Sequence, residues 1–213
     1  MYRLRTFAMT IDQVRDIFGA TPDLAARLRS EAAERFAPPQ RPATFLDKLG
    51  PLFRRAPATD VDPSRPLASD VDALLAGGFI PPERRGQCWE VLDAWLASLA
   101  HADERLDIPD LDALEYDLGF QGLPSQFSLR QLWTRDLGIP LPPPAGGFSG
   151  YAKHGHVVAT RDALRGVLEA TPDELTAQTR QICVLVVTLL DLIAAHPQQP
   201  MDLIAYAAPV VAH

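Results

Sequence analysis

The run Met201-Asp202-Leu203-Ile204-Ala205-Tyr206-Ala207 is predominantly apolar and follows prolines at positions 197 and 200. Such prolines end a preceding helix, and a short apolar run with β-branched and aromatic residues predicts a strand. At the other end of the sequence, Tyr2 to Ala8 alternates in character and carries aromatic residues, which predicts a second strand. We expect the two strands to belong to one sheet.

Helix signals dominate the sequence between these strands. Thr10 and Gln13 form a capping-box pattern, and Thr21-Pro22 places an N-cap residue before a proline at the first helical position. From about Pro82 to Ala100, apolar residues recur at steps of three and four and predict a core-facing helix. We therefore expect an α+β fold: a mainly helical single globular domain over residues 1–213, with a small mixed sheet formed by the N- and C-terminal strands.

Two further helices are expected in the last third of the sequence. Thr160 is the predicted N-cap of one of them, and Gly150 to Val158 before it is expected to be a loop entering a short extended segment. Thr171-Pro172-Asp173-Glu174 resembles a second capping box and predicts the start of the longest helix, which runs to about Ala195.

Residues 37–66 contain prolines at positions 38, 39, 42, 51, 57, 63 and 66, which forbid long regular elements. We expect a proline-rich surface excursion here, either a functional cover or an insertion.

The net charge of −7 argues against nonspecific nucleic-acid binding, which depends on basic patches. The longest apolar run, Ile182 to Ala195, is interrupted by Thr188 and Asp191 and falls short of the ~20 residues that a membrane span needs. The first residues lack the apolar stretch of a signal peptide. These features, together with the arginine- and alanine-rich composition, predict a cytoplasmic bacterial protein.

The order of the predicted elements resembles that of the YfbM-like family of uncharacterised bacterial proteins. The resemblance is carried by Tyr2-Arg3-Leu4 and Thr10-Ile11-Asp12 at the front and, at the back, by Gly150-Tyr151, His156 to Thr160, and Leu192 through Tyr206. Residues 37 to 140 are largely unmatched. The resemblance implies an α+β fold and carries over no catalytic residues.

The acidic stretch from Asp103 to Asp117 is the first candidate for a functional surface. It is expected to be loop-like, with a helical turn after Pro109 as an option and arginine only at Arg105, and usually such a run is simply a solvated face. As a docking surface it would speed and orient binding of a basic protein, and Trp89, displaced from the apolar stripe of its helix, is expected at the surface edge beside it. The candidate partner-binding residues are Asp103, Glu104, Asp107, Asp110, Asp112, Glu115, Asp117 and Trp89. Tyr116 is a further candidate anchor.

An alternative site lies at Tyr151, Lys153, His154 and His156, where a polar pocket could bind a small molecule or support catalysis. On a strand, the two histidines would share a face. No further ligand has diagnostic spacing, so no metal is predicted, and the absence of nucleotide, hydrolase and zincin motifs predicts no cofactor and favours a non-enzymatic role. Cys88 and Cys183, on apolar stripes, are expected to be reduced and inert.

These observations favour a cytoplasmic protein-binding role, an immunity- or antitoxin-like neutralisation of a basic partner such as a toxin domain. The alternatives are a small-molecule-binding protein or enzyme, and a structural or regulatory interaction protein.

Overall fold

The computed structural model describes residues 1–37, 62, 64–171, 174–195 and 200–210. The proline-rich excursion expected at 37–66 lies almost wholly outside these described residues. Seven α-helices and four strands are present in the described part, so the expected α+β class, mainly helical with both terminal strands in one sheet, is confirmed.

The sheet is built from β1 (Tyr2–Met9), β2 (Ala102–Ile108), β3 (Phe148–Ala152) and β4 (Asp202–Pro209), in the order β2-β1-β4-β3. All three pairings are antiparallel, which corrects the expectation of a mixed sheet. The two terminal strands are therefore neighbours at its centre, while β2 and β3 form its edges.

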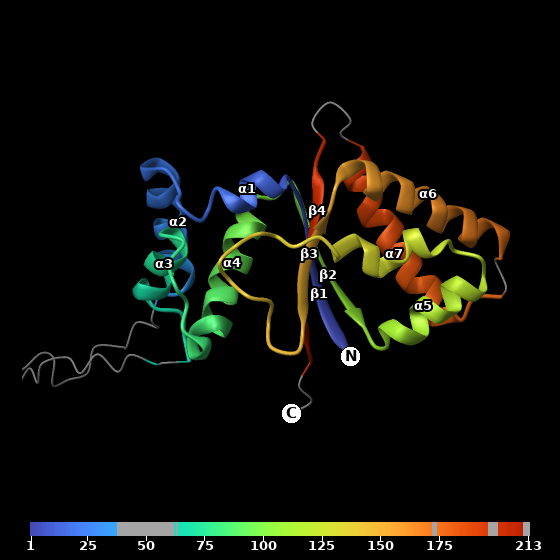
Figure 1. Cartoon of the computed structure of the whole chain (residues 1–213), viewed down its shortest axis with the longest axis horizontal. Helices are drawn as coiled ribbons and strands as arrows, with labels where there is room; N and C mark the ends of the chain where they lie inside the picture. Colours follow the sequence, from blue (N-terminus) through green and yellow to red (C-terminus); the bar gives the residue numbers. More distant parts are fainter. Residues whose placement is uncertain (38–61, 63, 172–173, 196–199, 211–213) are drawn as a thin grey trace, which may run out of the picture.

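Helices cover both faces of the sheet and make three layers (Figure 1). One layer holds α1 (Ile11–Arg15), α2 (Pro22–Arg35), α3 (Ala68–Leu75) and α4 (Arg85–Leu99), with the 3-10 turn η3 (Pro82–Arg84) before α4. The other holds α5 (Leu111–Phe120), α6 (His154–Ala170) and α7 (Ala177–Ala194), with the 3-10 turns η4 (Ser125–Phe127) and η5 (Leu129–Trp133).

Each helical layer encloses its own hydrophobic core against the sheet. Because successive strand residues point to opposite faces, Phe7 and Ile204 pack toward α1–α4, whereas Leu4 and Leu203 pack toward α5–α7. A strand that is buried on both faces reads as a continuous apolar run. This explains why the run at 201–207 lacks a regular polar alternation.

Local capping confirms two of the predicted helix starts. The Thr10 hydroxyl accepts the Gln13 N–H at 3.2 Å, and the Gln13 side chain accepts the Thr10 N–H at 2.9 Å. Thr21 is the N-cap of α2 with Pro22 at its first position. The apolar stripe on α4 is also confirmed, with Trp95 fully buried.

Other element boundaries were predicted wrongly. Thr171 is the C-cap of α6, where its N–H and hydroxyl both donate to the Val167 carbonyl, and α7 begins after the N-cap Thr176. Thr160 is buried in the middle of α6, which already begins at His154. The β-branched residues Val157 and Val158 suggested an extended segment, but the spacing of Val157, Leu164 and Val167 places them on one buried helical face.

Helix α7 is, by length and composition, the one described helix apolar enough to cross a membrane. It packs against α6, β2 and β4, and residues such as Cys183, Leu190 and Ile193 are fully enclosed. Its other side is open, since Val184, Leu185 and Leu192 are 43% to 49% exposed.

Close backbone approach at β3 requires glycine. A Cβ added to Gly150 would lie 2.0 Å from the Trp133 carbonyl oxygen and 2.8 Å from that of Arg135, whereas one added to Gly166 in α6 meets nothing within 4 Å.

We expect Gly150→Ala to lower the free energy of unfolding by about 2 to 3 kcal/mol because β3 must move away from η5. Gly166→Ala is the matched control and should raise it by up to about 1 kcal/mol, since alanine favours helix. Urea unfolding measures both, and equal stability of the two variants would contradict the contact.

Candidate functional site

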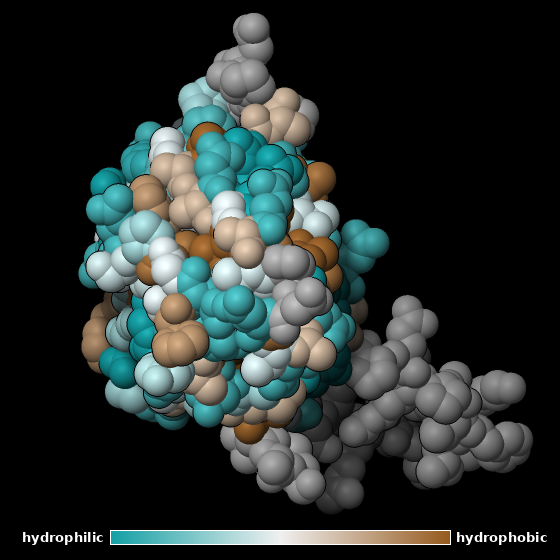
Figure 2. All heavy atoms as spheres, turned by 90° about the vertical axis from the view of Figure 1, so that its right-hand side faces the viewer, coloured by the Kyte–Doolittle hydropathy of each residue, from teal (hydrophilic) through white to brown (hydrophobic). Residues whose placement is uncertain are grey.

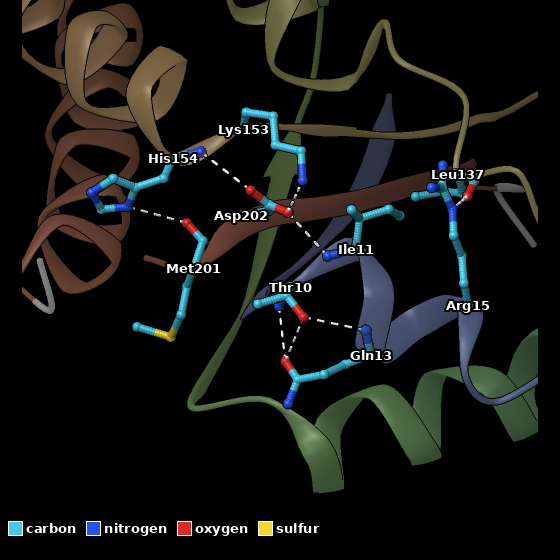
Figure 3. Close-up of polar contacts among 9 residues, drawn as sticks. All are labelled: Thr10, Ile11, Gln13, Arg15, Leu137, Lys153, His154, Met201 and Asp202. Atoms are coloured by element: carbon cyan, nitrogen blue, oxygen red, sulfur yellow. Dashed lines mark hydrogen bonds and ion pairs between the residues drawn. The ribbon is translucent and has the colours of Figure 1, made fainter. Parts of the chain in front are cut away.

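The buried carboxylate of Asp202 connects three elements at one end of the sheet (Figure 3). It accepts hydrogen bonds from the backbone N–H of Ile11 at 3.0 Å, the ammonium of Lys153 at 3.0 Å and the backbone N–H of His154 at 3.3 Å. Ile11 and His154 are the first residues of α1 and α6. A negative charge at two helix N-termini interacts favourably with both helix dipoles, so Asp202 fixes where both helices begin.

The residues predicted as an alternative pocket lie around this carboxylate but do not converge on a common point. His154 turns away from Lys153 (Figure 3), and its Nδ1 lies 3.2 Å from the Met201 carbonyl oxygen. Lys153 is engaged by Asp202. His156 stacks on Phe127, with ring centroids 6.1 Å apart.

The shared face expected for the two histidines is wrong, because both are on a helix rather than a strand. Residues two apart on a helix point about 200° apart, and His154 and His156 accordingly have different neighbours. Burial, followed by the nearby charge of Arg135, lowers the pKa of His156, which favours its neutral form. Among the described residues no group of three or more His, Cys, Asp or Glu side chains could hold a metal ion.

Tyr151 forms the centre of a small cationic cluster. Lys153 Nζ lies 5.5 Å and Arg15 Cζ 5.9 Å from the centroid of its ring. Arg15 also donates to the Leu137 carbonyl at 2.8 Å (Figure 3). These contacts hold α1, β3 and the segment after η5 together. The cluster around Tyr151 is therefore explained by its structural role in packing.

Substitution of Asp202 tests whether its carboxylate holds the starts of α1 and α6. Asp202→Ala should lower the free energy of unfolding by about 2 to 4 kcal/mol, because it leaves a buried N–H and a lysine without their acceptor. Lys153→Gln is the control: Lys153 is half exposed, so its loss should cost less than about 1 kcal/mol. Chemical denaturation compares the two, and similar costs would show that the carboxylate does not fix the helix starts.

A second buried network, unpredicted from the sequence, joins α4 to the sheet. Arg5 Nε donates to Asp93 Oδ1 at 2.7 Å, and the Tyr206 hydroxyl donates to the same oxygen at 2.7 Å. Arg5 also pairs with Asp103 at 2.9 Å. Burial, reinforced by the charge of Asp93, raises the pKa of Tyr206. The phenol therefore stays protonated and serves as a donor.

The acidic stretch is regular structure: its first half is a strand and not the expected loop, whereas the helical turn allowed after Pro109 is present as a full helix. Its first half is β2 and its second half is α5, with Asp110 as the N-cap that accepts the Ala113 N–H at 3.0 Å. Ion pairs with β1 help so polar a segment form a strand: Arg3 lies directly opposite Asp107 and donates to it at 3.0 Å, and Arg5, which lies opposite Arg105, pairs diagonally with Asp103 at 2.9 Å.

Most of the acidic residues have a partner within the chain. Asp112 pairs with the Arg130 guanidinium, and Glu115 accepts the Arg130 backbone N–H at 2.9 Å. Asp117 accepts weakly from Thr176 at 3.4 Å. The side chains of Asp107 and Asp112 nevertheless remain 45% and 90% exposed, so these contacts leave them accessible to a partner.

Two exposed aromatic residues lie on the same helix. Tyr116 is 76% and Phe120 75% exposed, and their rings stack with centroids 6.5 Å apart. Asp112, Tyr116 and Phe120 recur at four-residue steps and form one outward stripe of α5. We call this stripe the α5 patch. Of its members, Asp112 and Tyr116 were singled out from the sequence, whereas Phe120 was missed.

The expected position of Trp89 at the surface edge is wrong. Trp89 is 5% exposed, its indole N–H donates to the Pro142 carbonyl at 2.8 Å, and its ring lies 4.6 Å from that of Tyr206. The segment after η5 covers the side of α4 that the helical pattern alone leaves open. Trp89 therefore belongs to the core of the α1–α4 layer, on the opposite side of the sheet from the α5 patch.

Both cysteines are buried free thiols. Burial, followed by nearby carboxylates, raises the pKa of Cys88 to about 11 and that of Cys183 to about 12.

Because the thiolate is the reactive form, we expect no reaction of the folded chain with a thiol reagent such as dithionitrobenzoate at pH 8. Two thiols should react after denaturation in guanidinium. Rapid labelling of the native chain would contradict this placement.

No family model, curated protein or solved structure matches the chain. The resemblance to the YfbM-like family therefore stays a prediction.

Proposed function

We propose that this chain is a cytoplasmic protein-binding module that neutralises a basic partner protein, in the manner of an immunity protein or antitoxin. The contact surface in this proposal is the α5 patch together with the acidic strand β2. The single observation that carries it is the stacked, solvent-exposed pair Tyr116 and Phe120.

Exposed aromatic side chains of this size are costly to leave in water and are typical anchors of protein interfaces. Elsewhere on α5 the apolar residues Leu111, Leu114 and Leu118 are buried in the core, so the helix does not need its outward aromatics for folding. Figure 2, which looks onto the α5–α7 side of the molecule, shows apolar atoms reaching the surface in patches between hydrophilic ones. A partner that covers Tyr116 and Phe120 would remove their exposed rings from water.

Charge supports a basic partner. Residues 102–120 carry seven carboxylates and one arginine, which is a large part of the net charge of −7 of the whole chain. Exposed carboxylates around an apolar anchor accelerate and orient the approach of a positively charged protein. Asp107 and Asp112 remain 45% and 90% exposed beside Arg3 and Arg130, so a partner can reach both carboxylates.

The α5 patch can be tested by affinity capture with the full chain as bait. We expect wild type to retain a basic protein at low salt, and the variant Tyr116→Ser/Phe120→Ser to lose it. Removal of two interface anchors typically costs more than about 2 kcal/mol, which is at least about a 30-fold rise in Kd. Titration calorimetry with the purified partner then measures that change.

The matched control is Phe79→Ser, since Phe79 is 81% exposed but follows α3 in the other helical layer. It should bind as wild type does. Binding should also weaken as salt rises, because surface charges are screened. Retention of the same proteins by wild type and by the double variant, or loss with Phe79→Ser alone, would reject the α5 patch as the binding surface.

A further inference from the structure

We propose that the outer edge of β2 accepts an extended, mainly basic segment of the partner as a fifth strand, antiparallel to β2. The inference rests on the proposed function, because the segment belongs to the same basic partner. It specifies how the partner is recognised: by backbone hydrogen bonds along an open sheet edge, with side-chain charges selecting the segment.

The two edges of the sheet differ. The edge at β3 is engaged by its own chain, because the Tyr151 N–H donates to the Arg135 carbonyl at 3.0 Å and Gly150 lies tightly against the Trp133 carbonyl. At the other edge, no described residue pairs with the outer side of β2. Its residues 103, 104, 105 and 107 are all exposed.

Hydrogen-bond alternation identifies which backbone groups of β2 point outward. The Val210 N–H donates to the Met1 carbonyl at 3.2 Å, which continues the register between β1 and β4. Odd-numbered residues of β1 therefore exchange hydrogen bonds with β4, and its even-numbered residues exchange them with β2. The partners of these even residues on β2 are also even-numbered. The N–H and C=O groups of Asp103, Arg105 and Asp107 are consequently directed away from the sheet.

The side chains of β2 define what could pair with this edge. An antiparallel segment passes Asp107 first, then Leu106, Arg105, Glu104 and Asp103. Complementary cross-strand pairs require the order basic, apolar, acidic, basic, basic in that segment. Three basic residues in five agree with the basic partner inferred from the overall charge.

The same pattern disfavours a second copy of this chain. In the fully overlapping antiparallel register, Arg105 would face Arg105 of the other copy, and Asp103 would face Asp107. Like charges directly opposite each other are destabilising. The residues that follow β2 lead directly into α5, so the partner residues that precede the added strand would lie near the start of α5.

Hydrogen exchange on the full ¹⁵N-labelled chain tests the inference. The probe is a synthetic nine-residue peptide with the core Lys-Val-Glu-Lys-Arg flanked by threonines. In the free chain, the amides of Asp103, Arg105 and Asp107 should exchange rapidly, whereas those of Glu104 and Leu106, bonded to β1, should be protected. Bound peptide should slow exchange at the three odd positions by at least about tenfold and change the two even positions little.

A control peptide carries N-methyl groups at the first, third and fifth core residues, which removes the donors that face β2 and should abolish binding. In the protein, the exposed substitution Arg105→Glu should reverse the preference at the third core residue, so that lysine there binds about threefold better than glutamate.

Failure of the peptide to bind at up to about 1 mM, equal binding of the methylated peptide, or binding without protection of the odd-numbered amides would each overturn strand addition. If the partner is still lost with Tyr116→Ser/Phe120→Ser, the proposed function stands while this inference fails. If the peptide protects β2 but the double variant retains the partner, the edge is used and the α5 patch is rejected.

Discussion

The pairing of β1 with β4 is the interaction on which the rest of the structure depends. The two strands join in antiparallel register from Tyr2–Pro209 to Met9–Asp202, and β2 and β3 are added to this pair, one on each side. Because both faces of the central strands are buried, the side chains of this pair contribute to both hydrophobic cores. Each helical layer packs against the sheet and not against the other layer, so an error in this register would displace both cores at once.

The carboxylate of Asp202 extends the same constraint from the sheet to the helices. It lies at the first residue of β4, where it pairs with Met9 in register, and it holds the first amides of α1 and α6. One side chain therefore relates the start of a helix in each layer to a fixed point of the sheet. The polar residues around it, including Lys153 and Tyr151, are explained by this structural role.

The elements that could be predicted from the sequence are those whose signals are local. The Thr10–Gln13 capping box, the apolar stripe of α4 and the two terminal strands each depend on neighbouring residues, and each was predicted correctly. Strand β2 could not be predicted in this way, because its charged residues form a strand only when β1 supplies Arg3 and Arg5 from far away in the sequence. Trp89 was misplaced for the same reason, since its cover comes from Pro142.

The candidate site was predicted in part. Acidic residues and Tyr116 were identified by composition, and the structure places Asp112 and Tyr116 on one stripe of α5. Phe120 was missed because an aromatic residue at the end of an apolar helix usually belongs to the core, and only the tertiary structure shows which side faces water. The residues of the alternative pocket do not converge, because Lys153 and His154 are held by Asp202 and Met201, which lie far away in the sequence, and His156 stacks on Phe127.

The central position of β4 has a consequence for biosynthesis. When β1, the helices and β3 have left the ribosome, the space between β1 and β3 is still empty, and both strands expose unpaired backbone on their inner sides. Native pairing waits for β4 at the far end of the described chain, and contacts of such long sequence separation form slowly. During that interval the nascent chain presents two open strand edges and two unfinished apolar surfaces, which are the features that chaperones protect and that lead to aggregation when unprotected.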